Sequence, residues 1–320
     1  MPNLLLTDYC NRSCPYCFAK EKVALGAKAP RWHMSEDELE VVLGYLKRGR
    51  DLVSLLGGEP TLHPRYPSIV RSLVSRGYDL KIFSNGTTPQ LREGLADLPE
   101  TAVRIILNLN PPETYAPEEA AQLEANFRAC GARLTLSFNI WTPRFDWRYL
   151  REAIVKWGLG KTIRIGLAQP IQGVTNAFLD EPATREACRG LVAMAEALAP
   201  EGIIIAFDCG FRLCLFTEEE HGILAECGAD QHFLCGPILD IGQGLQVWRC
   251  FPFSGQGGVR LTDFKSLEEI RQHFLQQWSN ERKQGNGPAC AQCAHFRNET
   301  CLGGCLSRTV LRLRSLAGDG

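Results

Sequence analysis

Short apolar runs alternate with helix-like segments through residue 207 of this 320-residue chain, and this alternation limits the fold more than any other feature. Such a pattern is typical of βα units that build a parallel sheet. The expected strands are Asn3–Thr7, Leu52–Leu56, Leu80–Ser84, Val103–Leu109, Leu134–Ile140, Thr162–Gly166 and Gly202–Phe207. One expected helix begins at the capping box Ser35–Glu38. The other expected helices are Pro67–Arg76, Pro89–Leu95, Pro117–Cys130, Asp146–Trp157 and Ala183–Leu198. The pattern predicts an α/β domain over residues 1–207, with polar loops gathered at the carboxyl ends of the strands.

The composition excludes several classes of protein. A net charge of -1 and a pI near 6.6 lack the basic surface expected of a nucleic-acid-binding protein. We expect neither a membrane span nor a signal peptide, because no apolar run of about 18 residues occurs and no charged start precedes a short one. The 14 cysteines fall below the roughly 8–10% of a disulfide scaffold. We therefore expect a cytoplasmic protein whose thiols stay reduced and available to metals.

Three cysteines lie in one short loop directly behind the first apolar run. Cys10, Cys14 and Cys17 have the spacing C-x3-C-x2-C. Cysteine thiolates are the standard ligands of iron-sulfur clusters, and three of them on one loop leave the fourth iron of a cubane without a protein ligand. An open metal position is typical of a site that binds or activates a ligand. The alternatives are part of a zinc site and a redox pair of Cys14 and Cys17.

A second motif, Gly57-Gly58-Glu59-Pro60, follows the second expected strand. Adjacent glycines let the backbone approach a ligand closely, and Glu59 with nearby carbonyl groups can accept hydrogen bonds from an ammonium. Together with the C-x3-C-x-aromatic-C loop, in which Tyr16 is the aromatic residue, this motif resembles those of the radical SAM superfamily. The resemblance implies that the open iron binds the amino and carboxylate groups of S-adenosylmethionine (SAM), and that the Gly-Gly-Glu-Pro element contacts the methionine amino group.

The same resemblance implies a fold and further SAM contacts. The family has a partial (β/α)6 barrel of the TIM type. Ser84-Asn85-Gly86 resembles the third-strand element that contacts SAM, and a simple Asn-Gly turn is the alternative. Asn139 and Arg164 occupy places where relatives bind the ribose or the methionine carboxylate, and local hydrogen bonding is the alternative there.

Residues 208–320 form a second region that is rich in cysteine. Helical patterns fade and glycine becomes frequent, so we expect a small, irregular C-terminal domain. One cysteine pair flanks the hairpin-like stretch Ile241–Trp248, and four more form C-x2-C-x7-C-x3-C before a basic helix at Leu306–Leu316. The nine cysteines are Cys209, Cys214, Cys227, Cys235, Cys250, Cys290, Cys293, Cys301 and Cys305.

This arrangement resembles the SPASM extension of radical SAM enzymes, which carries two auxiliary 4Fe-4S clusters. The resemblance assigns to the first cluster Cys235, Cys250, Cys305 and one of Cys209, Cys214 or Cys227. It assigns to the second cluster Cys290, Cys293 and Cys301.

The chain departs from the family pattern after these cysteines. The spacing x7 exceeds the usual x5, and no cysteine follows Cys305. The fourth ligand of the second cluster is then an upstream thiolate, His295 or Glu299, or it is missing. A single auxiliary cluster is one alternative, and a structural zinc site on the last four cysteines is another.

The resemblance implies an oxidoreductase that cleaves SAM reductively and uses the 5'-deoxyadenosyl radical to remove a hydrogen atom from its substrate. SPASM extensions occur most often on enzymes that act on peptides or proteins. We therefore expect an oxidative crosslink or thioether in a ribosomally made peptide. The expected partners are a peptide or protein substrate and a low-potential electron donor. A separate leader-peptide-binding protein is a further expected partner, because the first strand already begins at residue 3.

Three other functions compete with this one. Formylglycine formation in a protein ranks second, because an acidic residue typically follows the second hairpin cysteine and Phe251 stands there. A small-molecule dehydrogenase ranks third. Outside enzymes, an iron-sulfur electron-transfer or sensor protein is the alternative, but such a protein has no need for Gly57–Pro60 beside an open iron.

Overall fold

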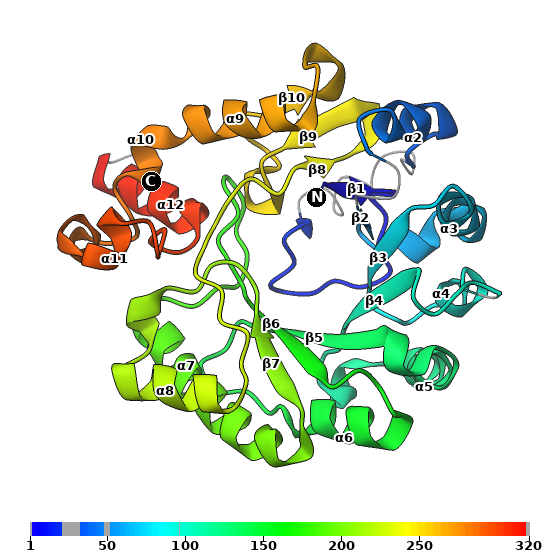
Figure 1. Ribbon diagram of the computed structural model, residues 1–320, viewed down its shortest axis with the longest axis horizontal. Coiled ribbons are helices and arrows are strands. Elements are labelled where there is room, and N and C mark those ends of the chain that lie inside the picture. Colours follow the sequence, from blue (N-terminus) through cyan, green and yellow to red (C-terminus); the bar gives the residue numbers. More distant parts are fainter. Residues whose placement is uncertain (1, 21–32, 48–51, 96, 318–320) are drawn as a thin grey trace.

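The structure, a computed structural model, describes residues 2–20, 33–47, 52–95 and 97–317. Its strands form one ten-stranded sheet in the order β10-β9-β8-β1-β2-β3-β4-β5-β6-β7, which curves around a central space (Figure 1). The strands of the first region are all parallel: β1 (Asn3–Leu5), β2 (Leu52–Leu56), β3 (Asp79–Ser84), β4 (Val103–Asn108), β5 (Leu134–Ile140), β6 (Thr162–Leu167) and β7 (Ile204–Phe207). The predicted α/β fold with a partial barrel is confirmed.

Helices cover the outside of the parallel strands (Figure 1). They are α2 (Glu36–Leu43), α3 (Tyr66–Ser75), α4 (Gln90–Glu93), α5 (Pro117–Cys130), α6 (Arg148–Trp157) and α7 (Glu181–Leu198). The predicted capping box before α2 is present, since the Ser35 side chain accepts from the Glu38 amide and the Glu38 side chain accepts from the Ser35 amide. Each βα unit therefore begins and ends close to where the sequence pattern places it.

Side chains of β3 show how the sheet divides its two faces. Leu80 and Ile82 are fully buried among the residues of the main core, whereas Lys81 and Phe83 are half-buried. Successive side chains of a strand point to opposite faces. The guanidinium group of Arg164 on β6 lies 5.3 Å from the centroid of the Phe83 ring, although β4 and β5 separate these strands in the sheet. The parallel strands thus curve enough for side chains to meet across the interior.

The C-terminal region joins the same sheet at its β1 edge. Strand β8 (Asp240–Ile241) runs parallel to β1, and β9 (Gln246–Trp248) and β10 (Val259–Arg260) follow as antiparallel neighbours. The pairing of Ile241 with Val247 confirms the expected hairpin. The Asn3 side-chain amide donates to the Asp240 carboxylate at 2.7 Å. The cysteine-rich region is therefore continuous with the barrel sheet.

Residues 208–320 are more helical than the sequence indicated. The helices are α8 (Glu218–Glu226), α9 (Leu267–Gln277), α10 (Ser279–Arg282), α11 (Ala294–Arg297) and α12 (Leu306–Ala317). Only α12 was expected. A capping box of Thr217 and Glu220 begins α8, and the Ser266 side chain caps α9. The expectation of fading helices was wrong because the many glycines and cysteines of this region outweighed the two cap signals in the sequence analysis.

The loop between β6 and α7 holds the two regions together. The amide of Ala177 donates to the carbonyl of Pro15 at 3.0 Å. The Gln172 side chain donates at 2.8 Å to both the carbonyl and the hydroxyl of Ser307 at the start of α12. Arg308 also donates to the carbonyls of Ala168 and Leu179 in this loop. The loop between β6 and α7 therefore contacts both the segment that carries Cys10, Cys14 and Cys17 and the C-terminal helix α12.

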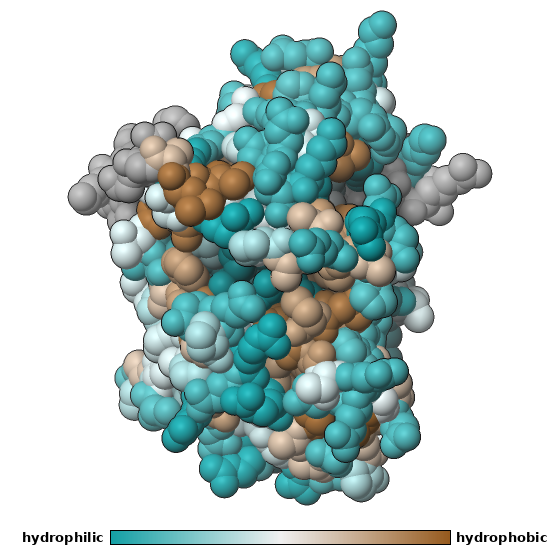
Figure 2. All heavy atoms as spheres, turned by 90° about the vertical axis from the view of Figure 1, so that its left-hand side faces the viewer, coloured by the Kyte–Doolittle hydropathy of each residue, from teal (hydrophilic) through white to brown (hydrophobic). Residues whose placement is uncertain are grey.

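The outer surface is mainly polar. On the face that carries α11 and α12, hydrophilic residues predominate and hydrophobic residues occur in small groups (Figure 2). Among the helices that the structure describes, none has both the length and the apolar character needed to cross a membrane.

Candidate active site

The loop after β1, residues 6–20 (the cysteine loop), lies at the carboxyl ends of the strands (Figure 1). It continues the pairing of β1 with β2, because Gly58 donates its amide to the Thr7 carbonyl and Glu59 donates to the Tyr9 carbonyl, both at 2.8 Å. Cys10 follows directly. The two motifs that the sequence analysis joined are thus bonded to each other through their backbones.

Gly57 and Gly58 are required by this close approach. A Cβ atom on Gly57 would lie 2.3 Å from the Thr7 carbonyl oxygen, and one on Gly58 would lie 2.5 Å from the Tyr9 carbonyl oxygen and 2.9 Å from the Cys10 Cβ. Any side chain would push the cysteine loop away. The two glycines are expected to let the backbone approach a ligand. In the structure they also allow the cysteine loop to pack closely on the end of β2.

Glu59 is fully buried and its carboxylate is already well bonded. It accepts from the hydroxyls of Thr61 at 2.6 Å and Ser84 at 2.8 Å, and from the backbone amide of Asn85 at 2.7 Å. Burial raises the pKa of this carboxyl group, and the hydrogen bonds oppose that rise. Glu59 and Ser84 therefore join the ends of β2 and β3. Contact of either residue with SAM stays a prediction.

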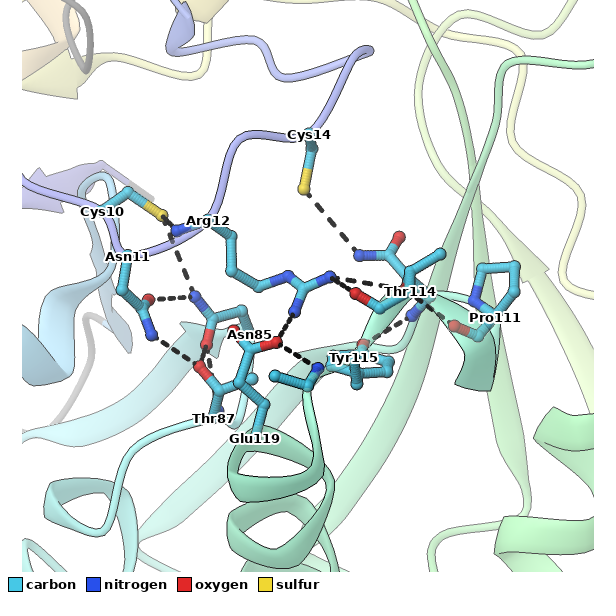
Figure 3. Close-up of polar contacts among 12 residues, drawn as sticks. Cys10, Asn11, Arg12, Cys14, Asn85, Thr87, Pro111, Thr114, Tyr115 and Glu119 are labelled. Carbon is cyan, nitrogen blue, oxygen red and sulfur yellow. Dashed lines mark hydrogen bonds and ion pairs between the residues drawn. The ribbon is translucent and has the colours of Figure 1, made fainter.

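Asparagine side chains approach two of the cysteine sulfurs (Figure 3). The Asn85 amide nitrogen lies 3.9 Å from the Cys10 sulfur and donates to Asn11 at 2.9 Å. Asn110, two residues past the end of β4, places its amide nitrogen 3.8 Å from the Cys14 sulfur. Hydrogen bonds to cluster sulfurs tune a cluster's reduction potential. Sequence reasoning missed Asn110, although its place beyond a strand end was a usable signal.

Arg12 anchors the middle of the cysteine loop (Figure 3). Its guanidinium group forms an ion pair with Glu119 at 2.8 Å and donates to the Thr114 carbonyl at 3.1 Å. The same group lies 4.2 Å from the centroid of the Tyr115 ring. The Arg12 side chain is only 10% exposed. Sequence reasoning missed this residue, which ties the loop between Cys10 and Cys14 to the start of α5.

Tyr16 links the cysteine loop to the barrel interior. Its hydroxyl accepts from the Asn108 side chain at 2.9 Å and forms a short hydrogen bond with Asn110. The Asn139 amide donates in turn to Asn108 at 2.8 Å. Burial raises the pKa of Tyr16, so its hydroxyl stays protonated and can donate. The predicted site residue Asn139 therefore belongs to a chain of amides that ends at the loop.

Arg164 lies deeper in the barrel and already has a partner. It forms an ion pair with Asp208, just past β7, and donates to the Ser137 hydroxyl at 3.4 Å. A Cβ on Gly166 would meet the side chains of both Asn139 and Asp208, so these groups are close neighbours. A role of Arg164 in holding the methionine carboxylate stays a prediction, and the described geometry gives this residue an interior ion pair.

Four C-terminal cysteines converge beside Asp208, and we call them the inner cysteine group: Cys209, Cys235, Cys250 and Cys305. One nitrogen of the Arg249 guanidinium lies 3.9 Å from the Cys235 sulfur and 3.6 Å from the Cys250 sulfur. The thiols of Cys235 and Cys305 are hydrogen-bonded to each other. A Cβ on Gly210, the neighbour of Cys209, would lie 3.7 Å from the Cys305 Cβ.

Two arginines give the inner cysteine group an electropositive setting. Arg249 is 2% exposed, and Arg282 donates to the Cys235 sulfur at 3.1 Å. The hydrogen bond with Cys305, followed by the two guanidinium groups, holds the pKa of Cys235 well below its ordinary value. A buried guanidinium group needs an anionic partner, and thiolates bound to an iron-sulfur cluster supply that charge. The donor set therefore fits an anionic cluster.

The other C-terminal cysteines lie apart from this group. Cys290 and Cys293 are half-buried on a 3-10 turn before α11, and Cys301 is buried after it. Cys214 is exposed between β7 and α8, and Cys227 is half-buried at the end of α8 beside Glu196 and Glu226. In the described ranges no three His, Cys, Asp or Glu side chains converge tightly enough for a single metal ion.

The cysteine loop also fits a cluster. Burial raises the pKa of Cys10 to about 12 and that of Cys17 to about 11. Cys10, Cys14 and Cys17 are near enough for their charges to repel one another. Such thiols become thiolates only when a cation joins them, and iron of a cluster is such a cation. The side-chain amides of Asn85 and Asn110, which approach the Cys10 and Cys14 sulfurs, donate without bringing charge.

A partial parallel barrel with three cysteines on the loop after its first strand defines a scaffold for an iron-sulfur cluster that keeps one iron open. Residues 4–153 match the family described as the Radical SAM superfamily, so this part of the chain is a radical SAM domain. A radical SAM domain is an enzyme domain, and it implies a 4Fe-4S cluster and SAM as cofactors. The cysteine loop lies inside the matched region and provides the predicted cluster ligands.

Curated relatives match only part of the chain. One is the S-adenosylmethionine-dependent nucleotide dehydratase of Lacinutrix mariniflava, which is 34% identical over 107 residues, or 32% of this chain and 22% of the relative. Another is the GTP 3',8-cyclase of Synechococcus elongatus, which is 33% identical over 95 residues, 30% of this chain and 29% of the relative. The chain thus spans less than a third of the length of these relatives.

Solved structures match nearly the whole chain at low identity. Streptococcus suis SuiB bound to S-adenosylmethionine has a TM-score of 0.63 and 14% identity over 91% of this chain and 70% of SuiB. Native anSMEcpe with bound AdoMet and the Cp18Cys peptide has a TM-score of 0.62 and 16% identity over 95% of this chain and 89% of anSMEcpe. The shared fold therefore includes the cysteine-rich C-terminal region.

Proposed function

We propose that this radical SAM enzyme removes a hydrogen atom from a peptide or protein substrate and forms an oxidative crosslink or thioether in a ribosomally made peptide. When bound, the first cluster and SAM would supply the 5'-deoxyadenosyl radical, and auxiliary clusters would accept the electron that remains when the new bond forms. The enzyme also requires a low-potential electron donor, and a separate protein is proposed to bind the leader of the peptide. The chain's own residues must position the substrate and exclude water.

The observation that carries the proposal is the place of the inner cysteine group. Cys209 directly follows Asp208, which pairs with Arg164 inside the barrel. The cysteine loop and the inner cysteine group therefore both face the carboxyl ends of the parallel strands, where barrels of this kind build their sites. A substrate in the interior would lie between the two. This placement suits an oxidation in which the radical and the electron acceptor act on one substrate.

The comparisons support a peptide over a nucleotide. SuiB was solved with its precursor peptide SuiA, and anSMEcpe with the Cp18Cys peptide, and both share the fold over the C-terminal region. The match to the nucleotide dehydratase covers about a third of the chain. Formylglycine formation stays second, because Phe251 stands where an acidic residue is expected after Cys250.

The test is anaerobic turnover with short precursor-like peptides encoded beside the gene. We expect SAM-dependent release of 5'-deoxyadenosine and a peptide that has lost two hydrogen atoms, measured by mass spectrometry. Cys250→Ala should still cleave SAM in the presence of peptide but give little product. Cys227→Ala is the matched control, because this cysteine lies outside the inner cysteine group. Full product yield from a folded Cys250→Ala protein would contradict the proposed role of the auxiliary cluster.

A further inference from the structure

Once the inner cysteine group is assigned, the cysteine run of residues 290–305 provides only three ligands for a second cluster. The fourth member of the inner cysteine group is Cys209, since the thiols of Cys235 and Cys250 are near enough to interact electrostatically with it. Cys290, Cys293 and Cys301 then remain as a set of three, and residues 306–320 contain no cysteine. Two upstream thiols, Cys214 and Cys227, are still unassigned.

A direct packing contact brings the segment of Cys214 to the last cysteines. The aliphatic part of Arg212 lies against Gly304, where an added Cβ would meet the Arg212 Cγ at 2.7 Å. Arg212 is 8% exposed, so this contact is an interior one. Gly304 lies three residues after Cys301, and Arg212 lies two residues before Cys214. The two cysteines therefore lie near the same contact between the segment of residues 212–214 and that of residues 301–304.

A second set of contacts joins the same two segments. Leu213 accepts a hydrogen bond at its carbonyl from the His221 ring at 3.0 Å, and that ring packs edge-on to Phe233 with centroids 5.6 Å apart. The Phe233 carbonyl accepts in turn from the Leu302 amide at 3.4 Å. The immediate neighbours of Cys214 and Cys301 are thus joined through one pair of rings. Arg185 holds the Cys214 carbonyl at 2.8 Å from the other side.

The Cys214 thiol is near enough to those of Cys301 and Cys290 for their charges to repel one another. Cys290 is packed against Gly285, where an added Cβ would lie 2.7 Å from its sulfur, and the Cys293 amide bonds the Cys290 carbonyl at 3.1 Å. A cubane separates its cysteine ligands more widely than a single ion does, so this set suits a cluster without forming a single-ion site.

The competing ligands are less well placed. Cys227 lies at the end of α8, where its charged neighbours are the carboxylates of Glu196 and Glu226. Such neighbours oppose a thiolate. His295 is exposed and its ring nitrogen already contacts the Thr300 hydroxyl at 3.2 Å.

We propose that Cys214 is the fourth protein ligand of a second auxiliary 4Fe-4S cluster that Cys290, Cys293 and Cys301 also bind. The proposal rests on the proposed function only in assuming that auxiliary clusters are present. It replaces the trailing cysteine of the family pattern with a thiolate from the turn between β7 and α8. The second cluster would then join the barrel's last βα connection to the C-terminal cysteines.

The first test measures iron in a full-length background that lacks the cysteine loop's thiols, with Cys10, Cys14 and Cys17 all changed to Ala. We expect about eight irons per chain in this parent, from two clusters. Adding Cys214→Ala should remove about four irons or leave a three-iron cluster with its own EPR signal. Cys227→Ala, the matched control, should keep the parent's iron content and spectrum.

Two outcomes of this test would overturn the proposal. One is an unchanged iron content and EPR spectrum in the Cys214→Ala protein, and the other is a parent with only about four irons. Loss of the second cluster in His295→Gln but not in Cys214→Ala would assign the ligand to the imidazole instead. SAM cleavage by the unmutated protein is measured separately, so the proposed function can stand or fall independently of this ligand.

The second test needs no variant. In the loaded protein, Cys214 should resist iodoacetamide although its side chain is exposed, and it should react once chelation and oxidation remove the clusters. Mass spectrometry of the digested protein gives the extent of alkylation at each cysteine. Cys227 is the internal control and should change little on loading. Rapid alkylation of Cys214 in protein with a full complement of iron would contradict the proposal.

Discussion

The cysteine loop and the inner cysteine group bind their proposed clusters in opposite ways. In the loop, three cysteines lie within eight residues, and neutral amides of Asn85 and Asn110 approach the sulfurs. In the inner cysteine group, four cysteines come from segments between residues 209 and 305, and the guanidinium groups of Arg249 and Arg282 face them. In the first site the ligands are close in sequence and amides approach the sulfurs, whereas in the second the ligands come from distant segments and guanidinium groups approach the sulfurs.

This difference indicates what each site must do. Three ligands on one loop leave an iron open for SAM, and the surrounding strands need only hold the loop in place. Four ligands from distant segments close a site completely, and each ligand bond also fixes one part of the C-terminal region to another. Loss of the cluster in the cysteine loop should abolish SAM cleavage. Loss of the cluster in the inner cysteine group should also lower the free energy of unfolding.

The largest effect is expected from Cys14→Ala. A loop that retains two thiolates cannot hold the site-differentiated cluster, so SAM cleavage should fall to the background level. Release of 5'-deoxyadenosine, measured by liquid chromatography, checks this. The iron bound by the C-terminal cysteines should persist. Normal 5'-deoxyadenosine yield would disprove the assignment of the open cluster to this loop.

Cys305→Ala tests the assembled site. The change should remove the first auxiliary cluster and leave Arg249 buried without its anionic partner, at a cost of about 3–5 kcal/mol. Thermal unfolding of the loaded protein should shift down by about 10 °C, given roughly 2–4 °C per kcal/mol for chains of this class. SAM cleavage should remain measurable in the folded fraction. An unchanged melting temperature together with full iron content would rule out a bridging role.

Gly58→Ala separates the position of the loop from its ligands. The new Cβ would overlap the Tyr9 carbonyl oxygen, 2.5 Å away, and displace the cysteine loop. A shift of about 1 Å in a reacting group can cost on the order of 100-fold in rate, so SAM cleavage should fall by about that factor while iron content stays near normal. Gly222→Ala is the control, because nothing lies within 4 Å of its Cβ position on α8. Equal rates for the two variants would refute the packing argument.

Arg12→Lys should have the smallest effect of the four. Lysine keeps the charge near Glu119 but loses the planar contact with Tyr115 and the hydrogen bond to Thr114. We expect SAM cleavage to fall by about tenfold or less, corresponding to roughly 1 kcal/mol. Arg148→Lys, in an exposed pair with Asp146, serves as the control. If Arg12→Ala and Arg12→Lys both behave like the control, the loop does not depend on this anchor.

The sequence predicted the βα units well because local signals were strong. Strands β2 and β5 and helix α5 have the expected bounds, since each joins a run of suitable residues to clear breakers or caps. The carboxyl-edge rule also placed the two motifs together, and their backbone bonding bears this out. Helices α8 and α9 were missed because their signals, a Thr and a Ser cap followed by acidic residues, were read as part of an irregular region.

Residue roles in the site depended on contacts that no local pattern reveals. The Ser84 and Asn85 donors to the Glu59 carboxylate come from the end of β3, and the Asp208 partner of Arg164 follows β7. The choice of Cys209 among three upstream cysteines followed from the packing of Gly210 on Cys305 and from the nearness of Cys209 to Cys235 and Cys250. The sequence gives the number and spacing of the cysteines, but it does not show which of their thiols lie close together in the fold.

The pairing of β1 with β8 sets an order of events during synthesis. Asn3 bonds to Asp240, a residue that is 237 positions later in the chain. At roughly 5–20 residues per second, the ribosome needs about 10 to 50 s to make that partner. For this interval the β1 edge has no β8 to cover it. Strand β1 and the cysteine loop that follows it are therefore synthesised well before the sheet can be completed at this edge.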